Sequence, residues 1–564
     1  MKNKITLTGS LGIAAIVFAV GLFSSCEYGQ KSENDKTEQG VGAVGIQTGD
    51  ATIRQLGEML KKSEDAGSLD NLAQLLQNQG KYADAEPLYR HALQIREKEF
   101  GSEHLEVAES LNNLAVLLVD NGKYSEAEQL YRRALRIRER MLGVNHPKVA
   151  ETLNDMAKLL VIQYKYLDAE PLIRRAKQIC EKKLEPDHPE MAESLSNLAE
   201  LYYFDGKFFE AERMLRRALQ IREKEHGVDH LELSENLDYL AVSLIYQRKF
   251  SEAELLVRRA LQIHEKEPGP DHPEMAESLN TLALLFMDQY KHSEGEQLSR
   301  RALSISEKTL RKGHPDIAFN LGILSLLLQA QDKYAEAEQL SRRALSISEK
   351  ALGKQHPDIA FNLGILASSL QAQGDYAKAE TLYRRALSIS EKTFGKEHFL
   401  LVTELYGLAS LFQEQGKYSE AEALYRRALS INEKALGKQH PYVAASLNKL
   451  TVLYFEQGKY AEAELFLQHA LQISEKALGK QHPDVAASLS MLAVLNYEQG
   501  RYAEAESLFQ HALQISEKAL GKSHPYTIAI KRIHEGFRKK MNRNGWLSFL
   551  SLENIIKWLG ELGV

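Results

Sequence analysis

A histidine recurs every 42 residues along most of the chain, and imidazole is both a common metal ligand and a general base. The recurring histidines are His104, His146, His188, His230, His272, His314, His356, His398, His440, His482 and His524. Zinc holds its ligands about 2 Å away, whereas residues one repeat apart belong to helix pairs packed on the order of 10 Å apart. Proline follows eight of the eleven histidines, as is typical of a first helical turn. The ladder therefore predicts helix starts, and we expect no metal.

Other short motifs that could do chemistry lack the context that the chemistry needs. Residues 40–45 match GxGxxG, but no βαβ pattern surrounds them. Residues 521–523 read Gly-Lys-Ser, as at the end of a P-loop, but Ser516 stands where the earlier glycine is required. His534-Glu535 is not followed by a second histidine at the HExxH spacing. We therefore expect no catalytic residues, no cofactor and no enzymatic activity.

The first 26 residues have the form of a targeting signal. Lys2 and Lys4 precede a mostly apolar run over 11–23, which is too short for an ordinary membrane span. The run ends in Phe-Ser-Ser-Cys26, which resembles the lipobox of bacterial lipoproteins. The resemblance implies a signal peptide over 1–25, lipidation of Cys26, and a membrane-anchored lipoprotein of the bacterial cell envelope facing the periplasm or exterior. A plain secretory signal, and thus a secreted protein, is the alternative.

Residues 26–50 are polar and glycine-rich, which predicts a flexible tether.

The 42-residue period contains two amphipathic helical segments. In the unit that spans 482–521, apolar residues fall at helical spacing in both halves, and Gly500 and Gly521 end the halves as left-handed helix caps. Each unit therefore reads as helix A, a tight turn, helix B and a short loop. Such an array stabilises a long chain because each repeat packs only on its neighbours.

The chain carries a net charge of -6, whereas proteins that bind nucleic acid usually present a basic surface. The charge therefore argues against a nucleic-acid partner.

The pattern resembles the tetratricopeptide repeat (TPR). It is carried by Leu114-Ala115, Leu118, Gly122, Tyr124, Ala127, Tyr131 and Ala134. Glu139 replaces the proline that ends helix B in the 34-residue form, so we expect helix B to run about two turns longer. The longer form is similar to the repeats of kinesin light chains, and the resemblance covers roughly residues 62 to 535.

The resemblance implies an all-α protein, a right-handed superhelical solenoid of about eleven TPR helix-turn-helix repeats with a C-terminal capping helix. The predicted parts are the TPR array over 51–521, the capping helix over 522–541 and an amphipathic tail over 542–564. Of the remaining features, Cys180 is interpreted as a buried small hydrophobe. The recurring Arg-Arg pairs, such as Arg132-Arg133, are interpreted as structural ion pairs.

In TPR superhelices the A helices line a concave groove, and side chains six and three residues before the helix-A alanine point into it. The resemblance thus implies peptide-groove candidates, namely Glu109, Asn112, Asn113, Glu151, Asn154, Glu193, Asn197, Glu235, Asp238, Glu277, Asn280 and Asn448. Asparagine amides can pair with a peptide backbone, as they do in kinesin light chains, and the glutamates favour basic ligands. The alternative is that the glutamates only offset helix dipoles. The asparagines would then be solvated residues that recur only because the repeats descend from one another.

The expected function is a non-catalytic scaffold that binds peptides or partner proteins in this groove, with no small-molecule substrate. Two alternatives stay open. The array could be a structural spacer or assembly factor of an envelope complex that acts through its ends and tail. It could also be the regulatory subunit of an enzyme.

Overall fold

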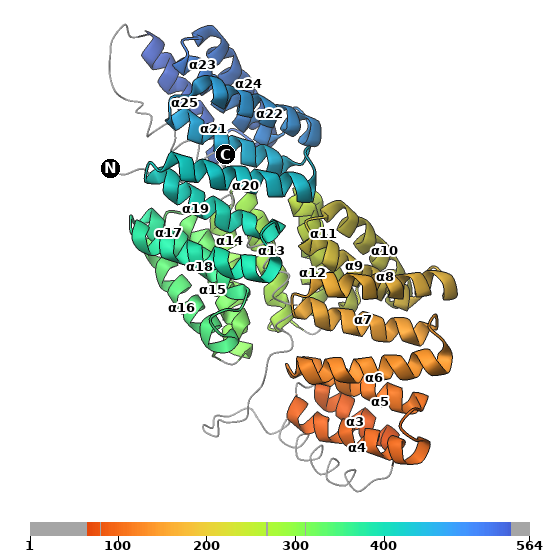
Figure 1. Cartoon of the computed structure of the whole chain (residues 1–564). Coiled ribbons are helices and arrows are strands. Elements are labelled where there is room, and N and C mark those ends of the chain that lie inside the picture. Colours follow the sequence, from red (N-terminus) through yellow and green to blue (C-terminus); the bar gives the residue numbers. More distant parts are fainter. Residues whose placement is uncertain (1–64, 79–80, 267–268, 311, 543–564) are drawn as a thin grey trace. The chain divides into compact units, whose positions relative to one another are not determined.

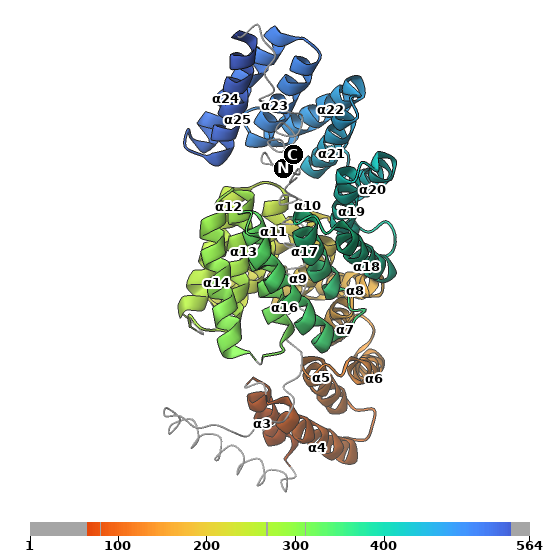
Figure 2. The same cartoon turned by 90° about the vertical axis from the view of Figure 1, so that its left-hand side faces the viewer.

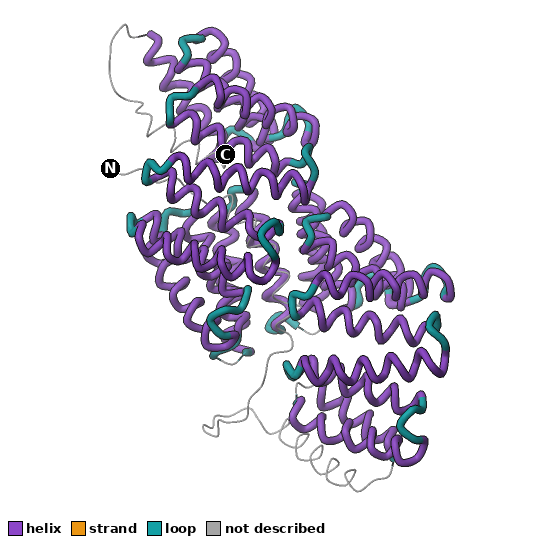
Figure 3. The backbone as a smooth tube through the Cα atoms, in the orientation of Figure 1, coloured by secondary structure: helices purple, strands orange, loops and turns teal. Residues whose placement is uncertain are grey.

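The computed structural model describes residues 65–78, 81–266, 269–310 and 312–542. In these ranges every regular element is a helix, and the tube in Figure 3 shows no strand there. Helices α3 to α24 form eleven successive pairs and α25 follows them, as Figure 1 and the turned view in Figure 2 show. The predicted all-α array of eleven helix pairs is confirmed.

The first helix of each pair is called the A helix and the second the B helix. The A helices are α3 (Ala66–Asn78), α5 (Leu105–Asp120), α7 (Pro147–Ile162), α9 (Pro189–Phe204), α11 (Ser234–Tyr246), α13 (Pro273–Asp288), α15 (Pro315–Gln329), α17 (Asp358–Ala372), α19 (Val402–Glu414), α21 (Pro441–Glu456) and α23 (Pro483–Glu498). The B helices are α4 (Tyr82–Phe100), α6 (Tyr124–Leu142), α8 (Tyr166–Lys183), α10 (Phe208–His226), α12 (Phe250–Lys266), α14 (His292–Thr309), α16 (Tyr334–Leu352), α18 (Tyr376–Phe394), α20 (Tyr418–Leu436), α22 (Tyr460–Leu478) and α24 (Tyr502–Leu520). Short 3-10 helices, η1 (Leu231–Leu233) and η2 (Phe399–Leu401), precede α11 and α19. B helices of up to 19 residues confirm the predicted extension.

The histidine ladder caps the starts of the A helices from α5 to α23 and the start of α25. Each of the eleven histidines accepts, at its Nδ1 atom, a hydrogen bond from the backbone N–H two residues later, at 3.2–3.4 Å. This bond satisfies one of the amides that a helix start leaves without an intrahelical partner. The predicted capping role is confirmed.

The turn between helix A and helix B needs a residue in the left-handed region. Glycine occupies this position in most repeats, for example Gly122 with φ 72° and Gly500 with φ 80°, because it lacks the Cβ that makes this region costly. Four repeats instead place a larger residue there at φ 58–60°, and these residues are Tyr164, Arg248, Tyr290 and Asp332. Such residues carry a conformational cost that contacts of their side chains must offset.

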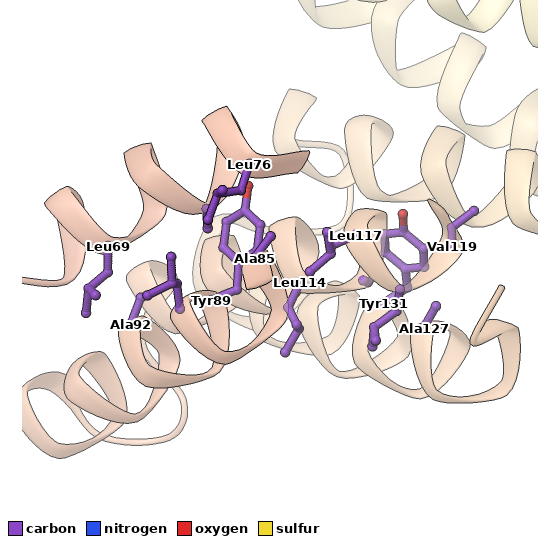
Figure 4. Close-up of a cluster of buried hydrophobic side chains, with 14 of the residues drawn as sticks. Leu69, Leu76, Ala85, Tyr89, Ala92, Leu114, Leu117, Val119, Ala127 and Tyr131 are labelled. Atoms are coloured by element: carbon purple, nitrogen blue, oxygen red, sulfur yellow. The ribbon is translucent and has the colours of Figure 1, made fainter. Parts of the chain in front are cut away.

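Helices pack through small residues of the A and B helices and large residues between them. In the cluster of Figure 4, Tyr89 and Tyr131 project from α4 and α6 between Leu76, Leu114 and neighbouring alanines, and all of these side chains are buried. Close packing of this kind repeats along the chain and supplies the apolar burial that stabilises a solenoid.

The paired arginines join neighbouring B helices. In most pairs the first arginine contacts a glutamate one turn earlier, as in Arg132 Nη2 to Glu128 Oε1 at 2.6 Å, which confirms the interpretation. In most pairs the second arginine contacts the preceding repeat, as in Arg175 Nη2 to Glu139 Oε1 at 2.6 Å. The repeat-to-repeat contact was not predicted from the sequence.

The described residues divide into two compact units. The N-terminal unit holds residues 65–201 and 213–229, and the C-terminal unit holds residues 202–212 and 230–542. Helix α25 (Pro525–Asn542) follows the last pair and exposes Lys531, Arg532 and Glu535, as predicted for a capping helix. The described helices include none with the length and apolarity needed to cross a membrane. The signal peptide, Cys26, the tether and the amphipathic tail lie outside the described residues.

Candidate functional site

The five glutamates of the first groove register lie on A helices and keep part of each side chain at the surface. They are Glu109 on α5, Glu151 on α7, Glu193 on α9, Glu235 on α11 and Glu277 on α13. Glu109 and Glu235 are exposed and the other three are half-buried. The first three belong to the N-terminal unit and the last two to the C-terminal unit.

In the N-terminal unit, Glu151, Asp155, Glu190 and Glu193 influence one another, and we call these four residues the carboxylate cluster. Burial, together with the charges of the other three, raises the pKa of Glu190 to about 7. Burial also raises the pKa of Asp155 to about 6, with Glu151 and Glu193 adding to the effect, although Asn112 donates a hydrogen bond to Asp155 at 2.7 Å. Burial is the larger cause of both shifts, and the neighbouring carboxylates add a negative potential to it. The cluster therefore favours a bound cation.

Three cations of the chain lie at the edges of this cluster. Arg138 Nη1 lies 3.3 Å from Glu151 Oε1, and Lys148 Nζ lies 2.7 Å from Glu151 Oε2. Arg222 Nη2 lies 2.6 Å from Glu193 Oε2. Four carboxylates thus face three cations, and Glu151 and Glu193 keep 28 % and 41 % of their side chains exposed. A ligand can reach both glutamates from solvent.

Two members of the cluster were not predicted from the sequence. Asp155 stands 42 residues after Asn113, which was predicted as a groove residue, so the repeat register could have identified it. Glu190 stands 42 residues after Lys148 and two after the capping histidine His188. Its place in the first helical turn gave no reason to assign it to the groove, and only the packing of α7 beside α9 shows the proximity.

Residues of the second groove register lie between neighbouring A helices. Asn112 donates to Asp155, Asn154 donates to Ser194, Asn280 donates to Asn320, and Asp238 accepts from Ser278. The members Asn112, Asn154, Asp238, Asn280 and Asn448 are each at most 8 % exposed. The bonds of the first four join one repeat to the next and give these side chains a structural role. Their role in peptide binding stays a prediction.

Two further candidates stand one residue later in the register, on α5 and α9. Asn113 is half-buried. Asn197 is 6 % exposed, and its Nδ2 atom donates to no other residue within the described ranges. Because this atom is buried, the unused donor does not by itself mark a ligand contact, and the role of both asparagines in peptide binding stays a prediction.

The C-terminal unit contains a smaller acidic group on α11 and α13. Burial raises the pKa of Asp238 to about 7, its hydrogen bond from Ser278 lowers it, and Glu235 and Glu274 raise it further. Glu274 also has a raised pKa because of burial and Glu235. Acidic side chains therefore also lie close together on the A helices of the C-terminal unit.

The predicted structural role of Cys180 is confirmed by its surroundings. It is fully buried on α8, and its Sγ lies 3.8 Å from Ser194 Oγ and from the carbonyl oxygen of Glu190. Burial raises the pKa of its thiol, which disfavours the reactive thiolate.

A protein-family model described as "Tetratricopeptide repeat" matches most of the chain. The matched residues are 64–140, 148–224, 190–266, 237–308, 274–350, 316–392, 358–434, 399–476, 454–518 and 484–532. No curated protein sequence matches the chain.

Solved structures of repeat proteins are similar to parts of the chain. TPR-like repeats of kinesin light chain type from Podosopora anserina are 28 % identical, with a TM-score of 0.30, and cover 37 % of this chain and 98 % of that one. BtubC (BKLC) from P. vanneervenii is 25 % identical, with a TM-score of 0.33, and covers 46 % of this chain and 94 % of that one. The APC/C hetero-tetramer Cut9-Hcn1 is 13 % identical, with a TM-score of 0.42, and covers 88 % of this chain and 94 % of that one.

Proposed function

The chain belongs to the tetratricopeptide repeat family, and on that premise we propose that it is a non-catalytic scaffold that binds a basic, extended segment of a partner protein. The proposed binding surface is formed by α5, α7 and α9 of the N-terminal unit. The observation that carries the proposal is the carboxylate cluster of Glu151, Asp155, Glu190 and Glu193. TPR arrays are typically interaction scaffolds rather than enzymes.

The cluster suits a lysine or arginine side chain for an electrostatic reason. Four acids and three cations leave one formal negative charge when all are ionised, and two of the acids are held above their ordinary pKa. An added cation relieves this repulsion and restores ionisation. Charge complementarity of this kind chiefly sets specificity and the rate of encounter.

The triple variant Glu151→Gln/Glu190→Gln/Glu193→Gln is expected to bind a fluorescent lysine-rich peptide about tenfold more weakly, because three partly exposed charges contribute a few tenths to about 1 kcal/mol each. Fluorescence anisotropy with the lysine-rich peptide, and with a glutamate-rich peptide of equal length, measures this affinity.

Wild-type affinity for the lysine-rich peptide should also rise between pH 5.5 and pH 7.5, because Asp155 and Glu190 ionise across their pKa values of about 6 and about 7.

The control for this experiment is Glu99→Gln/Glu181→Gln/Glu225→Gln, which removes the same charge from exposed positions on B helices of the N-terminal unit. It should leave the affinity unchanged. If both triple variants weaken binding equally, net charge rather than the cluster attracts the peptide. If neither changes it, the site assignment is wrong.

We further propose that the scaffold is anchored to a bacterial membrane through a lipid on Cys26. The support is the apolar run over 11–23 that ends in Ser-Ser-Cys26. Expression with radiolabelled palmitate is expected to label the wild-type protein, and Cys26→Ala is expected to remove the label and release the protein from the membrane fraction. Cys180→Ala, which changes a buried cysteine, should keep the label. An unlabelled wild-type protein in the medium would instead identify a secreted protein.

A further inference from the structure

The residues that replace glycine in two A–B turns of the C-terminal unit contact helix starts far along the chain. Arg248, in the turn after α11, has φ 60°, and Tyr290, in the turn after α13, has φ 59°. Glycine would adopt this conformation without the cost that a Cβ adds. A larger residue persists there only when its side chain makes compensating contacts.

Arg248 reaches the starts of α21 and α23. Its Nε lies 3.5 Å from Asp484 Oδ2, and its guanidinium lies 5.8 Å from the ring centre of Tyr442. The Arg248 side chain is 19 % exposed, which places the cation in a partly desolvated contact where charge and ring attraction strengthen. Tyr246, at the end of α11, adds an edge contact with Tyr442 at 5.5 Å between ring centres.

The neighbouring turns make equivalent contacts on either side of Arg248. The ring of Tyr290 lies 5.6 Å from Tyr526 and 5.8 Å from His524, and His524 Nε2 lies 3.4 Å from the carbonyl oxygen of Gln289, 235 residues away. At the turn after α9, a Cβ on Gly206 would lie 3.3 Å from the Phe399 ring. Gly206 therefore serves two purposes here. It lets the Phe399 ring approach the backbone closely, and it adopts a φ of 76° without the cost that a Cβ adds.

These contacts form one row, which we call the seam. On one side are the ends of three successive A helices, represented by Gly206, Arg248 and Tyr290. On the other are the starts of later helices, represented by Phe399 in η2, Tyr442 in α21, Asp484 in α23 and Tyr526 in α25. All of these residues belong to the C-terminal unit. Contacts between repeats so far apart arise when the winding of the array brings a later turn against an earlier one.

We infer that the seam is a latch that holds the C-terminal unit in a wound state and can open without unfolding any repeat. Each repeat is stabilised by packing on its immediate neighbours, and a solenoid is close to a chain of nearest-neighbour interfaces. The seam lies outside those interfaces and consists of side-chain contacts at helix ends, which also include the rings of Phe208 and Tyr246 against Phe399 at 5.8 Å and 6.1 Å. Its opening therefore changes the winding while leaving the helix pairs intact. The carboxylate cluster lies in the other unit, so the latch does not depend on the proposed binding site.

The test compares Arg248→Gly, Tyr290→Gly and the double variant with the wild-type full chain by small-angle X-ray scattering and circular dichroism. Glycine is the residue of most other repeats at this turn, so the turn itself is preserved. The expected result is a shift to a larger radius of gyration, greatest in the double variant, with unchanged helix content.

The matched control is Asp332→Gly. Asp332 has the same left-handed conformation, φ 59°, but accepts a hydrogen bond from Tyr334 of its own repeat. It should leave the radius of gyration unchanged. An unchanged radius in the double variant would overturn the latch. Loss of helix content in the seam variants, with Asp332→Gly intact, would overturn it too, because the contacts would then be needed for folding and not for winding alone.

Discussion

Replacing Glu404 with glutamine is expected to stabilise the protein by about 3 kcal/mol at pH 8 and to leave its stability unchanged at pH 4. Glu404 lies in α19 and is 4 % exposed. Ser390 Oγ donates to its Oε1 at 3.0 Å, and its Oε2 accepts no hydrogen bond from the described chain. Burial raises its pKa from 4.5 to about 7.

The sign of the pH dependence follows from this pKa. Below pH 4.5 the carboxyl is protonated in both the folded and the unfolded chain, so it costs nothing. Between pH 4.5 and about 7 the unfolded chain ionises first, and the folded state loses stability as the pH rises. Above pH 7 the full cost remains, and glutamine avoids it because it keeps the shape without the charge.

Urea unfolding followed by circular dichroism at pH 4 and pH 8 measures this effect. Glu420→Gln, which changes an exposed glutamate on α20, is the control and should change little at either pH. The prediction would be contradicted by equal effects of Glu404→Gln at both pH values, or by destabilisation at pH 8.

Variants at the packed pair Tyr383 and Gly407 are also expected to change the stability of the protein strongly. A Cβ on Gly407, in α19, would lie 2.9 Å from Cζ of the fully buried Tyr383 ring in α18. Gly407→Ile is therefore expected to destabilise the protein by about 3 kcal/mol through overpacking. Tyr383→Ser should cost about 3–5 kcal/mol through the cavity that it leaves.

The double variant Tyr383→Ser/Gly407→Ile should recover a large part of both losses. The same two register positions already hold Ser299 with Ile323 and Ser341 with Ile365 in earlier repeats, and all four side chains are fully buried. The urea midpoints of the two single variants and the double variant form a double-mutant cycle, which isolates the coupling. Additive losses would show that the two side chains do not share a volume.

A matched glycine separates overpacking from backbone effects. Gly364 lies in the interior of α17, and a Cβ there would meet no atom within 4 Å. Gly364→Ala should stabilise its helix by up to about 1 kcal/mol, whereas Gly407→Ala should destabilise. The same sign for both would contradict the steric account.

Much of the fold could be predicted from the sequence because its contacts are local and periodic. The capping bond of His104 spans two residues, and the pairing of Arg132 with Glu128 spans four. Because the period of 42 residues has no insertion, the same short contacts recur in most repeats. Helix bounds, caps and the positions of buried alanines follow from these short separations.

The candidate site was predicted only in part. The family resemblance implied Glu151, Glu193, Asn112 and Asn154 as groove residues. The structure gives both asparagines hydrogen bonds to the next A helix, and peptide binding by all four residues stays a prediction. A position in a repeat tells which face of a helix a residue occupies. It does not tell whether the neighbouring repeat supplies a partner, because that depends on which side chain stands about 40 residues later.

The repeat, its helices and the register of its faces can be predicted from the residues, since these depend on interactions within one repeat or between adjacent ones. The seam between Arg248 and Asp484 and its neighbours depends on the fold of many repeats together. The rotation from one repeat to the next is small, and it accumulates over several repeats before distant turns can meet. No single period of the sequence records the sum of these rotations.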